Sequence, residues 1–502
     1  MKILTAKQTR ELDAYTIEHE PITSIDLMER ASTMFVNWFT ERYPNQKRYI
    51  RIICGMGNNG GDGLAVARLL HEKGYPVRVN ICRFSERGSD DFELNLARIQ
   101  SIENLEITDI YPDHPLPEID PGEILIDAIF GSGLNRPVSG FWAGLLDYIN
   151  GQASAIISID IPSGLFADQP STGTTIHAHR TLTFELPKLA FLFPENQDKV
   201  GEWEYRSIGL SAKFQEELES THFFVDESLV RSYCHKRHKF DHKGTFGHAL
   251  LIAGSYGKVG AAILSAKAAL RSGLGLLTIH SPRCAYEILQ ISVPEAMVSI
   301  DRHRHFVSEW PEPGKYQAIG IGPGIDQKKT TVDAILGFIE AAQQPIVIDA
   351  DGLNILSQNK EFIPRLPASS ILTPHPKEFE RLFGKTNNSF DRLALQRQLA
   401  QEHGIIIVLK GAHTCIALPN GHCYFNSTGN PGMATGGSGD VLTGIITGLL
   451  AQQYRPEQAA ILGVYLHGLA GDLAAAELEH HSLIAGDLIN YLGKAFMQLC
   501  ER

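Results

Sequence analysis

Short apolar segments alternate with helix-like patterns along almost the whole chain. In the first half, the strand-like segments are residues 48–54, 76–84, 123–129 and 155–161, and Leu64, Ala67 and Leu70 repeat with helical spacing between the first two. In the second half they are residues 248–253, 276–280, 318–321, 346–349, 371–373 and 405–409, with a hairpin signal at Asn420-Gly421. This alternation predicts an α/β protein with mostly parallel sheets and helices on both faces.

The composition changes between residues 211 and 245, where we place a domain boundary. Residues 211–220 are polar and rich in Glu, and residues 231–243 form a cluster of Arg, Lys and His. The length of 502 residues is ample for two domains, and no short-period repeat indicates an array. We therefore expect domains at 1–215 and 226–502. The basic cluster is consistent with a phosphate-binding patch or with a solvated linker face, and the second is the commoner role of such a run.

Acidic residues outnumber basic ones, with 57 Asp and Glu against 45 Lys and Arg. The net charge of −12 argues against a protein that coats nucleic acid or an anionic membrane. The seven cysteines form no C-x-x-C pair, so they are interpreted as reduced residues of a cytosolic protein rather than as a disulfide framework or zinc site. The N-terminus lacks the apolar core of a signal peptide, and no segment is interpreted as a membrane span of about 20 residues. We expect a cytoplasmic location and no membrane or nucleic-acid partner.

A glycine-rich run, Gly55-Met56-Gly57-Asn58-Asn59-Gly60-Gly61-Asp62-Gly63, joins a strand-like segment to a helix-like one. Glycines at such a junction let backbone N–H groups approach a phosphate at the helix N-terminus. Residues 55–60 fit G-x-G-x-x-G, but an NAD-binding fold places Asp or Glu about 20 residues later, where this chain has Asn80 and Ile81. The pattern therefore disfavours a hydride-transfer domain, and it is interpreted as a ligand-binding loop rather than as a tight turn alone.

Two further loops follow strand-like segments in the same half. Asp127 precedes the loop 131–137, and Asp160 lies three residues before Ser163. Because the carboxyl ends of parallel strands meet at one edge of a sheet, these loops and the glycine-rich run can converge. Asn59, Asp127 and Ser163 would then offer oxygen ligands to a hard cation, and Asp160 could act as an acid or base. Each Asp taken singly could equally cap a turn.

This half resembles the YjeF N-terminal domain, the NAD(P)H-hydrate epimerase family, over about residues 5–210. The resemblance is carried by Arg10-Glu11-Leu12-Asp13, Leu27-Met28-Glu29-Arg30-Ala31, the glycine-rich run and Asp160-Ile161-Pro162-Ser163-Gly164. It implies a Rossmann-like doubly wound sheet, a potassium ion held by Asn59, Asp127 and Ser163, and a catalytic Asp160 that contacts the reacting ring. It also implies substrate binding by Asn58, Asn59, Gly60, Gly61, Asp62, Gly131, Ser132, Gly133, Leu134, Asn135, Arg136, Pro137 and Asp160. The chain departs from the family at Pro187-Lys188-Leu189-Ala190, where Pro-Lys-Pro-Gly is common, and at Phe166, where we expect Asp.

A second glycine-rich run, Gly436-Gly437-Ser438-Gly439-Asp440, precedes an apolar helical pattern in the second half. The free N–H groups of such a helix start can stabilise the charge of a phosphoryl group during transfer. Asp440 in the first turn could accept the proton of an attacking hydroxyl, the alternative being that it only caps the helix. Residues 410–414, after another strand-like segment, are a candidate phosphate and adenine contact, although in isolation they are only a turn.

This half resembles the ribokinase-like family, and within it the ADP-dependent NAD(P)H-hydrate dehydratases, over about residues 240–495. The resemblance is carried by His242-Lys243-Gly244, Gly254-Ser255, Gly322-Pro323-Gly324, Thr373-Pro374-His375-Pro376 and residues 430–440. It implies an α/β/α domain with a catalytic Asp440 that, with Ala261, Gly324 and His375, contacts the hydrated nicotinamide nucleotide. It further implies nucleotide binding by Lys410, Gly411, Ala412, His413, Thr414 and Gly439. Glu378 lies where related kinases order water on magnesium.

The two resemblances together imply repair of NADH or NADPH whose ring has taken up water. The first domain would epimerise the R and S hydrates, and the second would dehydrate the S form with ADP, giving AMP and phosphate. Potassium would serve the first site and magnesium the second, and we expect a homo-oligomer whose partners are small molecules.

Two other functions are weighed against this one. The first is a ribokinase-like small-molecule kinase with an accessory YjeF-type binding domain. The second is a binding module, since YjeF-like domains also occur in messenger-RNA decapping scaffolds. The presence of Asn59, Asp127 and Asp160 together favours chemistry, and the acidic charge gives no support for RNA binding.

Overall fold

A computed structural model describes residues 1–112, 114–152 and 155–500 of the chain. The chain divides into two compact units. One is Lys2–Ser220, and the other is Thr221–Arg502 together with Met1. The division falls in the polar stretch 211–245 at which the composition changes. Each unit is an α/β domain built on a sheet of its own.

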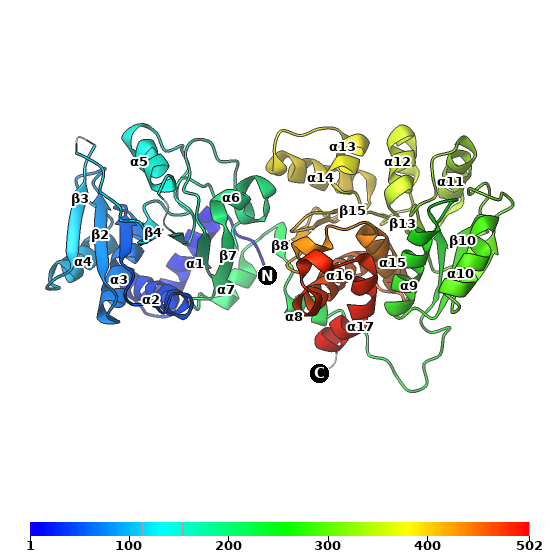
Figure 1. The fold of residues 1–502 in the computed structure, drawn as a ribbon, viewed down its shortest axis with the longest axis horizontal. Coiled ribbons are helices and arrows are strands. Elements are labelled where there is room, and N and C mark those ends of the chain that lie inside the picture. Colours follow the sequence, from blue (N-terminus) through cyan, green and yellow to red (C-terminus); the bar gives the residue numbers. More distant parts are fainter. Residues whose placement is uncertain (113, 153–154, 501–502) are drawn as a thin grey trace. The chain divides into compact units, whose positions relative to one another are not determined.

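The N-terminal domain has a parallel sheet in the order β3-β2-β1-β4-β5-β6-β7 (Figure 1). Its strands are β1 (Ile50–Cys54), β2 (Val77–Cys82), β3 (Glu106–Ile110), β4 (Ile124–Ala128), β5 (Ala155–Ile159), β6 (Arg180–Phe184) and β7 (Glu202–Arg206). Its helices are α1 (Ala6–His19), α2 (Ser24–Arg42), α3 (Asn58–Glu72), α4 (Asp90–Gln100), α5 (Gly140–Asn150), α6 (Gln197–Val200) and α7 (Ala212–Glu217).

Strand residues of the N-terminal sheet alternate between two apolar cores. Ile52 and Ile126 pack with α2, α3 and α4 on one face, whereas Ile53 and Leu125 pack with α5 on the other. Because side chains alternate along a strand, both faces of a sheet covered by helices must be apolar. The strand-like segments predicted at 48–54, 76–84, 123–129 and 155–161 are confirmed as β1, β2, β4 and β5.

The C-terminal domain has a mixed sheet in the order β11-β10-β9-β12-β13-β14-β15-β16-β17-β8. Its strands are β8 (His222–Phe224), β9 (His248–Ile252), β10 (Leu276–Ser281), β11 (Met297–Ile300), β12 (Ala318–Ile321), β13 (Ile346–Ile348), β14 (Ile371–Leu372), β15 (Ile406–Leu409), β16 (Cys415–Ala417) and β17 (Cys423–Phe425). β16 and β17 pair antiparallel across the hairpin predicted at Asn420-Gly421. The ribokinase-like α/β/α prediction is confirmed by this sheet and its helices.

Helices cover both faces of the C-terminal sheet, as Figure 1 shows. These helices are α8 (Glu227–Arg231), α9 (Val259–Arg271), α10 (Tyr286–Ser292), α11 (Lys329–Ala341), α12 (Ala350–Gln358), α13 (Pro376–Phe383), α14 (Ser389–His403), α15 (Ser438–Ala451), α16 (Pro456–Leu478) and α17 (Ala485–Cys500). Among the described residues, α16 is long and apolar enough to cross a membrane, but 78% of its most apolar window is buried within the domain. α16 is therefore best explained as a core helix.

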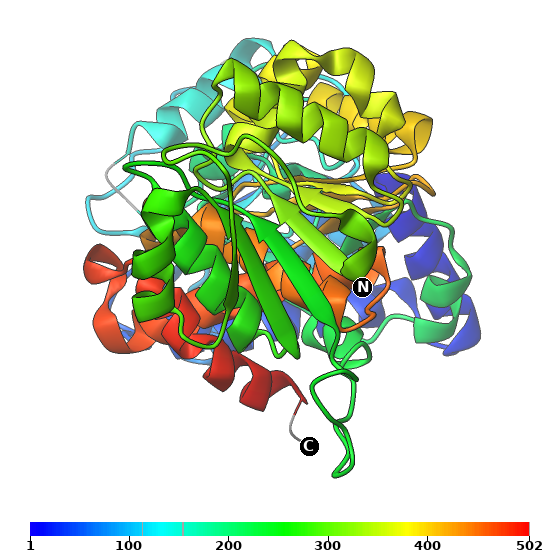
Figure 2. The same ribbon diagram turned by 90° about the vertical axis from the view of Figure 1, so that its right-hand side faces the viewer.

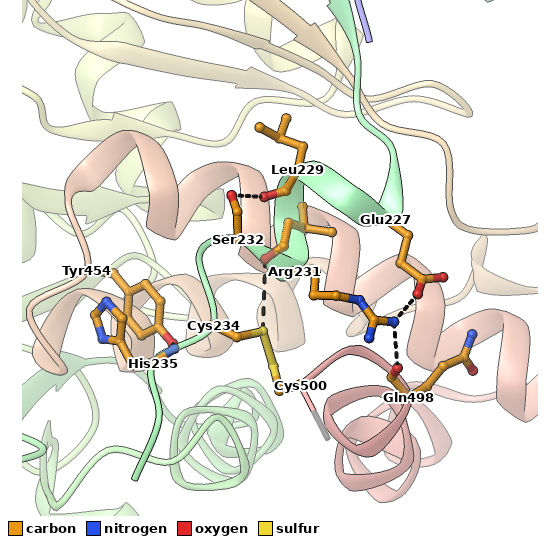
Figure 3. Close-up of a disulfide and its surroundings, with 10 residues drawn as sticks. Glu227, Leu229, Arg231, Ser232, Cys234, His235, Tyr454, Gln498 and Cys500 are labelled. Carbon is orange, nitrogen blue, oxygen red and sulfur yellow. Dashed lines mark hydrogen bonds and ion pairs between the residues drawn. A yellow bond between two sulfur atoms is a disulfide. The ribbon is translucent and has the colours of Figure 1, made fainter. Parts of the chain in front are cut away.

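A disulfide joins Cys234, which follows α8, to Cys500 at the end of α17 (Figure 3). The Cα atoms lie 5.8 Å apart although the residues are 266 positions apart in sequence. The prediction that the cysteines are all reduced is therefore wrong for this pair. Sequence spacing carries no signal for a bond of such separation, because only the packing of α17 brings the two residues together. The other cysteines, at positions 54, 82, 284, 415 and 423, are free.

The basic cluster at residues 231–243 begins in the last residue of α8 and continues into a loop. Residues 232–247 contain no helix or strand, and Figure 2 shows this loop extending away from the body of the C-terminal domain. Phe240 in this loop is 93% exposed. Such an extended, solvated segment agrees with the interpretation as an exposed charge run.

Candidate active sites

The first glycine-rich run forms the turn from β1 into α3. α3 begins at Asn58, six residues before the first residue of the predicted helical pattern, so Asn58–Asp62 form its first turns. A Cβ atom on Gly55 would lie 1.9 Å from the carbonyl oxygen of Ile129, and one on Gly60 would lie 1.9 Å from that of Gly55. Only glycine fits at these two positions, and the helix therefore starts against the end of β4 with uncapped N–H groups.

Asp127, at the end of β4, is buried and fully hydrogen-bonded. Its Oδ2 accepts from the Ser163 backbone N–H at 2.8 Å and from Ser158 Oγ at 2.9 Å, and its Oδ1 accepts from Ser163 Oγ at 2.5 Å and from the Ile129 N–H at 3.3 Å. Burial raises the pKa of Asp127, and the bonds from Ser163 and Ser158 oppose that shift. The carboxyl group thus ties the loop after β5 to the end of β4.

Asn59, Asp127 and Ser163 converge around the backbone of Phe130, as the parallel arrangement predicts. Asn59 Nδ2 donates to the Phe130 carbonyl at 3.2 Å, Ser163 Oγ lies 3.3 Å from the same oxygen, and the Phe130 N–H donates to Ser163 Oγ at 2.8 Å. One carboxylate surrounded by hydroxyl, amide and carbonyl oxygens is a donor set for a hard cation of low charge. The three residues therefore fit a metal site of that kind.

Asp160 lies at the end of β5 with a left-handed φ of 62°. Its Oδ1 accepts three hydrogen bonds: from Lys188 Nζ at 2.8 Å, from Thr183 Oγ1 at 3.0 Å and from the Phe184 N–H at 3.1 Å. Within the described chain its Oδ2 has no hydrogen-bond donor, so one oxygen is anchored and the other is free to meet a ligand. A strained backbone held by several donors is typical of a functional site.

The loop 131–137 joins this site through its first residue. A Cβ atom on Gly131 would lie 3.2 Å from Cβ of Asn59, which places the start of the loop beside one of the three candidate metal ligands. Gly133, Asn135, Arg136 and Pro137 are exposed, and Ser132 and Leu134 are partly buried. The structure thus places the loop at the site and leaves its distal end open to solvent.

Sequence reasoning assigned no role to three further residues near Asp160. Lys188 and Thr183 hold its carboxylate, and Asp13 on α1 is affected by the charges of both Asp160 and Lys188. Asp13 lies in a motif that carries the family resemblance, and Lys188 lies in the segment Pro187–Ala190 that departs from the family pattern, so both positions carried a signal in the sequence. Thr183 gave no signal, because a Thr in a strand is ordinary.

In the C-terminal domain, the second glycine-rich run forms the start of α15, as predicted. Gly437 precedes the helix with φ 92° and gives it no side-chain cap. The backbone carbonyl of Asp440, in the first turn, accepts from Ser265 Oγ at 2.9 Å, whereas its carboxyl group has no hydrogen bond among the described residues. The first N–H groups of α15 are thus available to an anion, and the Asp440 side chain is not used as a cap.

A cavity of about 460 Å³ lies beside the start of α15. Its lining includes Lys258, Ala261, Gly324, Asp351, Glu378 and Asp440. Ala261, Gly324 and Asp440 were expected substrate contacts, and the structure brings them together. Lys258, Asp351 and Asn354 were not anticipated, because their positions in surface-like polar contexts carry no distinctive pattern.

His375 was also an expected substrate contact, and its observed contacts are with α13. The His375 Nδ1 accepts from the Lys377 backbone N–H at 3.1 Å, and the His375 backbone N–H donates to Glu378 Oε2 at 2.8 Å. These bonds form a capping box. His375 thus fixes Glu378, which lines the cavity.

Lys410 reaches the cavity region from the end of β15. Its Nζ lies 2.8 Å from Asp349 Oδ1 and 3.9 Å from Glu378 Oε2, and a Cβ atom on Gly439 would lie 3.4 Å from it. Asp349 also accepts from Thr443 Oγ1 on α15 at 2.8 Å. The carboxylates of Asp349 and Glu378 and the ammonium of Lys410 therefore form one connected group at the start of α15.

Asp349 is a buried carboxylate of this connected group that sequence reasoning did not single out. It directly follows β13, and an Asp after a buried strand is the same signal that singled out Asp127. The pKa of Asp440 is raised to about 6, chiefly by burial and also by the charges of Asp349 and Asp351, while Lys410 opposes the shift. A carboxyl group in this range can accept and release a proton near neutral pH.

Residues 411–414 form a tight turn after Lys410. The Gly411 N–H donates to Thr414 Oγ1 at 3.2 Å, and Thr414 Oγ1 donates to the Gly411 carbonyl at 3.0 Å. Burial lowers the pKa of His413, so its imidazole is neutral at physiological pH. The turn directly follows Lys410 in the chain, but none of its residues lines the cavity.

These features define a two-domain α/β enzyme in which each half has a glycine-rich helix start without a side-chain cap and a candidate acid–base carboxylate. Family models match residues 24–190 as the YjeF-related protein N-terminus and residues 249–494 as NAD(P)H-hydrate dehydratase. The chain belongs to the family of bifunctional NAD(P)H-hydrate repair enzymes.

Relatives with that name match along essentially the full chain. The Moorella thermoacetica enzyme is 37% identical over all of this chain and 98% of its own length. The Escherichia coli enzyme is 32% identical over 94% of this chain and 89% of its own. A crystal structure of the ADP/ATP-dependent NAD(P)H-hydrate dehydratase from Bacillus subtilis, co-crystallised with ATP and Mg²⁺, is 36% identical with a TM-score of 0.50, covering 55% of this chain and 98% of that one.

Proposed function

We propose that this chain repairs hydrated NADH and NADPH in two steps. The N-terminal domain interconverts the R and S hydrates, and the C-terminal domain dehydrates the S form at the expense of ADP, giving AMP and phosphate. The observation that carries the proposal is the position of Asp440, which lines a cavity at the uncapped start of α15.

In the dehydration step, Asp440 accepts the proton of the substrate hydroxyl as that oxygen attacks the terminal phosphoryl group of the nucleotide. The first N–H groups of α15 and the ammonium of Lys410 stabilise the negative charge on that group. Phosphate is a far better leaving group than hydroxide, so the phosphorylated intermediate loses it with the ring nitrogen supplying electrons. Loss of a proton from the neighbouring ring carbon then restores the double bond.

In the epimerisation step, the reacting carbon carries a hydroxyl group beside the ring nitrogen. Such a carbon loses its configuration when a bond to oxygen or nitrogen breaks reversibly. The free Oδ2 of Asp160 is the atom suited to accept a proton there. The first turns of α3 and the loop 131–137 would hold the phosphate-bearing part of the substrate.

The proposed function involves two metal ions, one at each site. The oxygen atoms of Asn59, Asp127 and Ser163 suit potassium, which would fix the loops around the first site. At the second site, magnesium would arrive with the nucleotide phosphates, since it is commonly held by few carboxylates plus phosphate oxygens. Glu378 is the cavity carboxylate that supports this assignment. ADP is the proposed nucleotide, and the Bacillus subtilis relative is described as ADP/ATP-dependent.

The experiment that tests the proposal mixes the full chain with both hydrate epimers, ADP and magnesium, and follows the absorbance of the reduced nicotinamide. We expect complete recovery of the absorbance, with one phosphate released per reduced nicotinamide formed. Recovery of only half would show that epimerisation is missing. Accumulation of a phosphorylated product without recovery would show a kinase instead, and equal or better turnover with ATP would overturn the choice of ADP.

A further inference from the structure

Lys258 is a basic residue in a cavity whose other charged side chains are acidic. The cavity beside the start of α15 is lined by Asp351, Glu378 and Asp440, and among the described residues of its lining Lys258 is the one with a basic side chain. A hydrated dinucleotide carries the negative charges of its diphosphate. Repulsion between those charges and the acidic side chains would oppose binding unless a cation faces the phosphates.

The backbone of Lys258 packs against Gly324, one of the expected substrate contacts. The Lys258 N–H donates to the Ser255 carbonyl at 2.8 Å in a turn, and α9 begins at the next residue. Gly324 has a left-handed φ of 64°, and a Cβ atom there would lie 2.8 Å from the Lys258 carbonyl oxygen and 3.2 Å from Cβ of Ala261. Lys258 therefore starts beside two expected substrate contacts, at a position that close packing fixes.

The side chain of Lys258 has a partner that it can exchange for a ligand. Its Nζ lies 3.1 Å from Asp351 Oδ2, and the Lys258 and Asp351 side chains are 49% and 14% exposed. Asp351 has two other donors: its Oδ2 accepts from the Asp326 N–H at 3.0 Å, and its Oδ1 accepts from Gln327 Nε2 at 3.3 Å. Because those bonds remain when the ammonium moves, Asp351 is not left without a partner.

The surroundings of Lys258 favour the hydrated dinucleotide over ADP as its ligand. Ala261 and Gly324, which are expected contacts of the hydrate, line the cavity together with Lys258. The expected nucleotide contacts, residues 410–414 and Gly439, lie outside this lining. A lysine ammonium is a common phosphate ligand, because it is a compact charge with three donors on a flexible stem.

We propose that Lys258 binds a phosphate group of the hydrated dinucleotide and thereby positions the nicotinamide ring beside Asp440. The proposal rests on the proposed dehydratase function. Two phosphate groups offer the same chemistry: the diphosphate that both hydrates carry, and the 2′-phosphate that NADPH hydrate alone carries. The contact is remote from the reacting carbon, so it is equally strong in the bound substrate and in the transition state. Such a contact lowers KM and leaves kcat unchanged.

The test is dehydration of pure S hydrate by the full chain with ADP and magnesium. Lys258→Met, which keeps an aliphatic stem and removes the charge, should raise KM for the hydrate about tenfold, the low end for a charged hydrogen bond because the site is half exposed. The kcat and the KM for ADP should stay within about twofold of wild type. Lys258→Arg should restore most of the affinity. Lys267→Met, at an exposed position of α9, is the matched control and should behave as wild type.

Comparison of the two hydrates identifies the phosphate. An equal rise in KM for NADH hydrate and NADPH hydrate in Lys258→Met would assign the ammonium to the diphosphate, and a rise for NADPH hydrate alone would assign it to the 2′-phosphate. Either result supports the proposal. An unchanged KM for both hydrates would overturn it, as would a rise in the KM for ADP alone or a fall in kcat without a change in KM.

Binding without turnover separates this proposal from the proposed function. The S hydrate is titrated calorimetrically into the chain without nucleotide, at low and at high salt. Lys258→Met should raise the Kd about tenfold, and its Kd should depend less on salt than that of the wild type. A wild-type chain that shows this difference but does not dehydrate the hydrate with ADP would refute the proposed function and leave the phosphate contact standing. Equal Kd values for the wild type and Lys258→Met would overturn the contact itself.

Discussion

The Nζ atom of Lys188 lies 2.8 Å from Oδ1 of Asp160, and the two side chains are 5% and 16% exposed. Twenty-eight residues separate them in sequence, and the turn after β6 brings them together. This ion pair anchors Oδ1 of the carboxylate, whereas Oδ2 has no hydrogen-bond donor among the described residues.

Lys188→Met should lower epimerisation about 100-fold, because Asp160 loses the ammonium group that holds its carboxylate in place. Removing one partner of a buried ion pair should also destabilise the N-terminal domain by roughly 3 kcal/mol. Chromatography of the hydrates and urea unfolding measure the two effects. Lys213→Met, at an exposed position of α7, is the control. Wild-type epimerisation in Lys188→Met would contradict the role of the pair.

Asp160→Ala should reduce epimerisation to the spontaneous rate while leaving dehydration of the S hydrate intact. The reason is that the proton acceptor is removed from one domain and the other domain has its own carboxylate. Both activities can be followed on one preparation. Epimerisation that remains above the spontaneous rate would show that Asp160 is not the acceptor.

Asp440→Ala should have the opposite effect to Asp160→Ala: it should abolish nucleotide-dependent dehydration and leave epimerisation unchanged. In the wild-type chain, the base must be ionised, so the dehydration rate should fall as the pH drops through about 6. The measurement is the initial rate of absorbance recovery from pure S hydrate between pH 5 and 8. A rate that is independent of pH across this range would exclude Asp440 as the base.

Asp349→Asn should move the acidic limb of the dehydration profile to lower pH. The charge of Asp349 raises the pKa of Asp440, so its removal lets Asp440 ionise more easily. The same pH series as above detects the shift. Asp333→Asn, on the exposed side of α11, should leave the limb in place. If the limb instead moves to higher pH in Asp349→Asn, the ion pair between Asp349 and Lys410 affects the pKa of Asp440 more than the charge of Asp349 does.

Reduction of the Cys234–Cys500 disulfide should destabilise the C-terminal domain by about 2–4 kcal/mol, because the bond limits the unfolded chain. The unfolding transition of the N-terminal domain should not move. Calorimetry with and without a thiol reductant measures both, and the Cys234→Ser, Cys500→Ser double variant is the permanently reduced control. Titration of seven rather than five thiols in the denatured, unreduced protein would contradict the bond.

Most of the fold could be predicted from local patterns. The apolar segments 48–54 and 248–253 are strands β1 and β9, and Asn420-Gly421 turns the hairpin. The start of α3 could not be placed, because Gly60 and its neighbours are poor helix formers in isolation. The run also approaches the chain after β4 closely, where a Cβ atom on Gly55 would meet the Ile129 carbonyl, and such a contact between distant segments is a tertiary effect.

The sequence by itself determined where anions could bind and which carboxylates stand at strand or helix ends. Glycine runs and strand-end acids are local, and their chemistry depends on backbone geometry that a few neighbouring residues dictate. Tertiary structure alone decided which groups act on those carboxylates. The ion pair of Lys188 with Asp160, that of Lys410 with Asp349, and the disulfide between Cys234 and Cys500 all join residues that are far apart in the chain. Such pairs follow from how whole elements pack, and no local pattern encodes that packing.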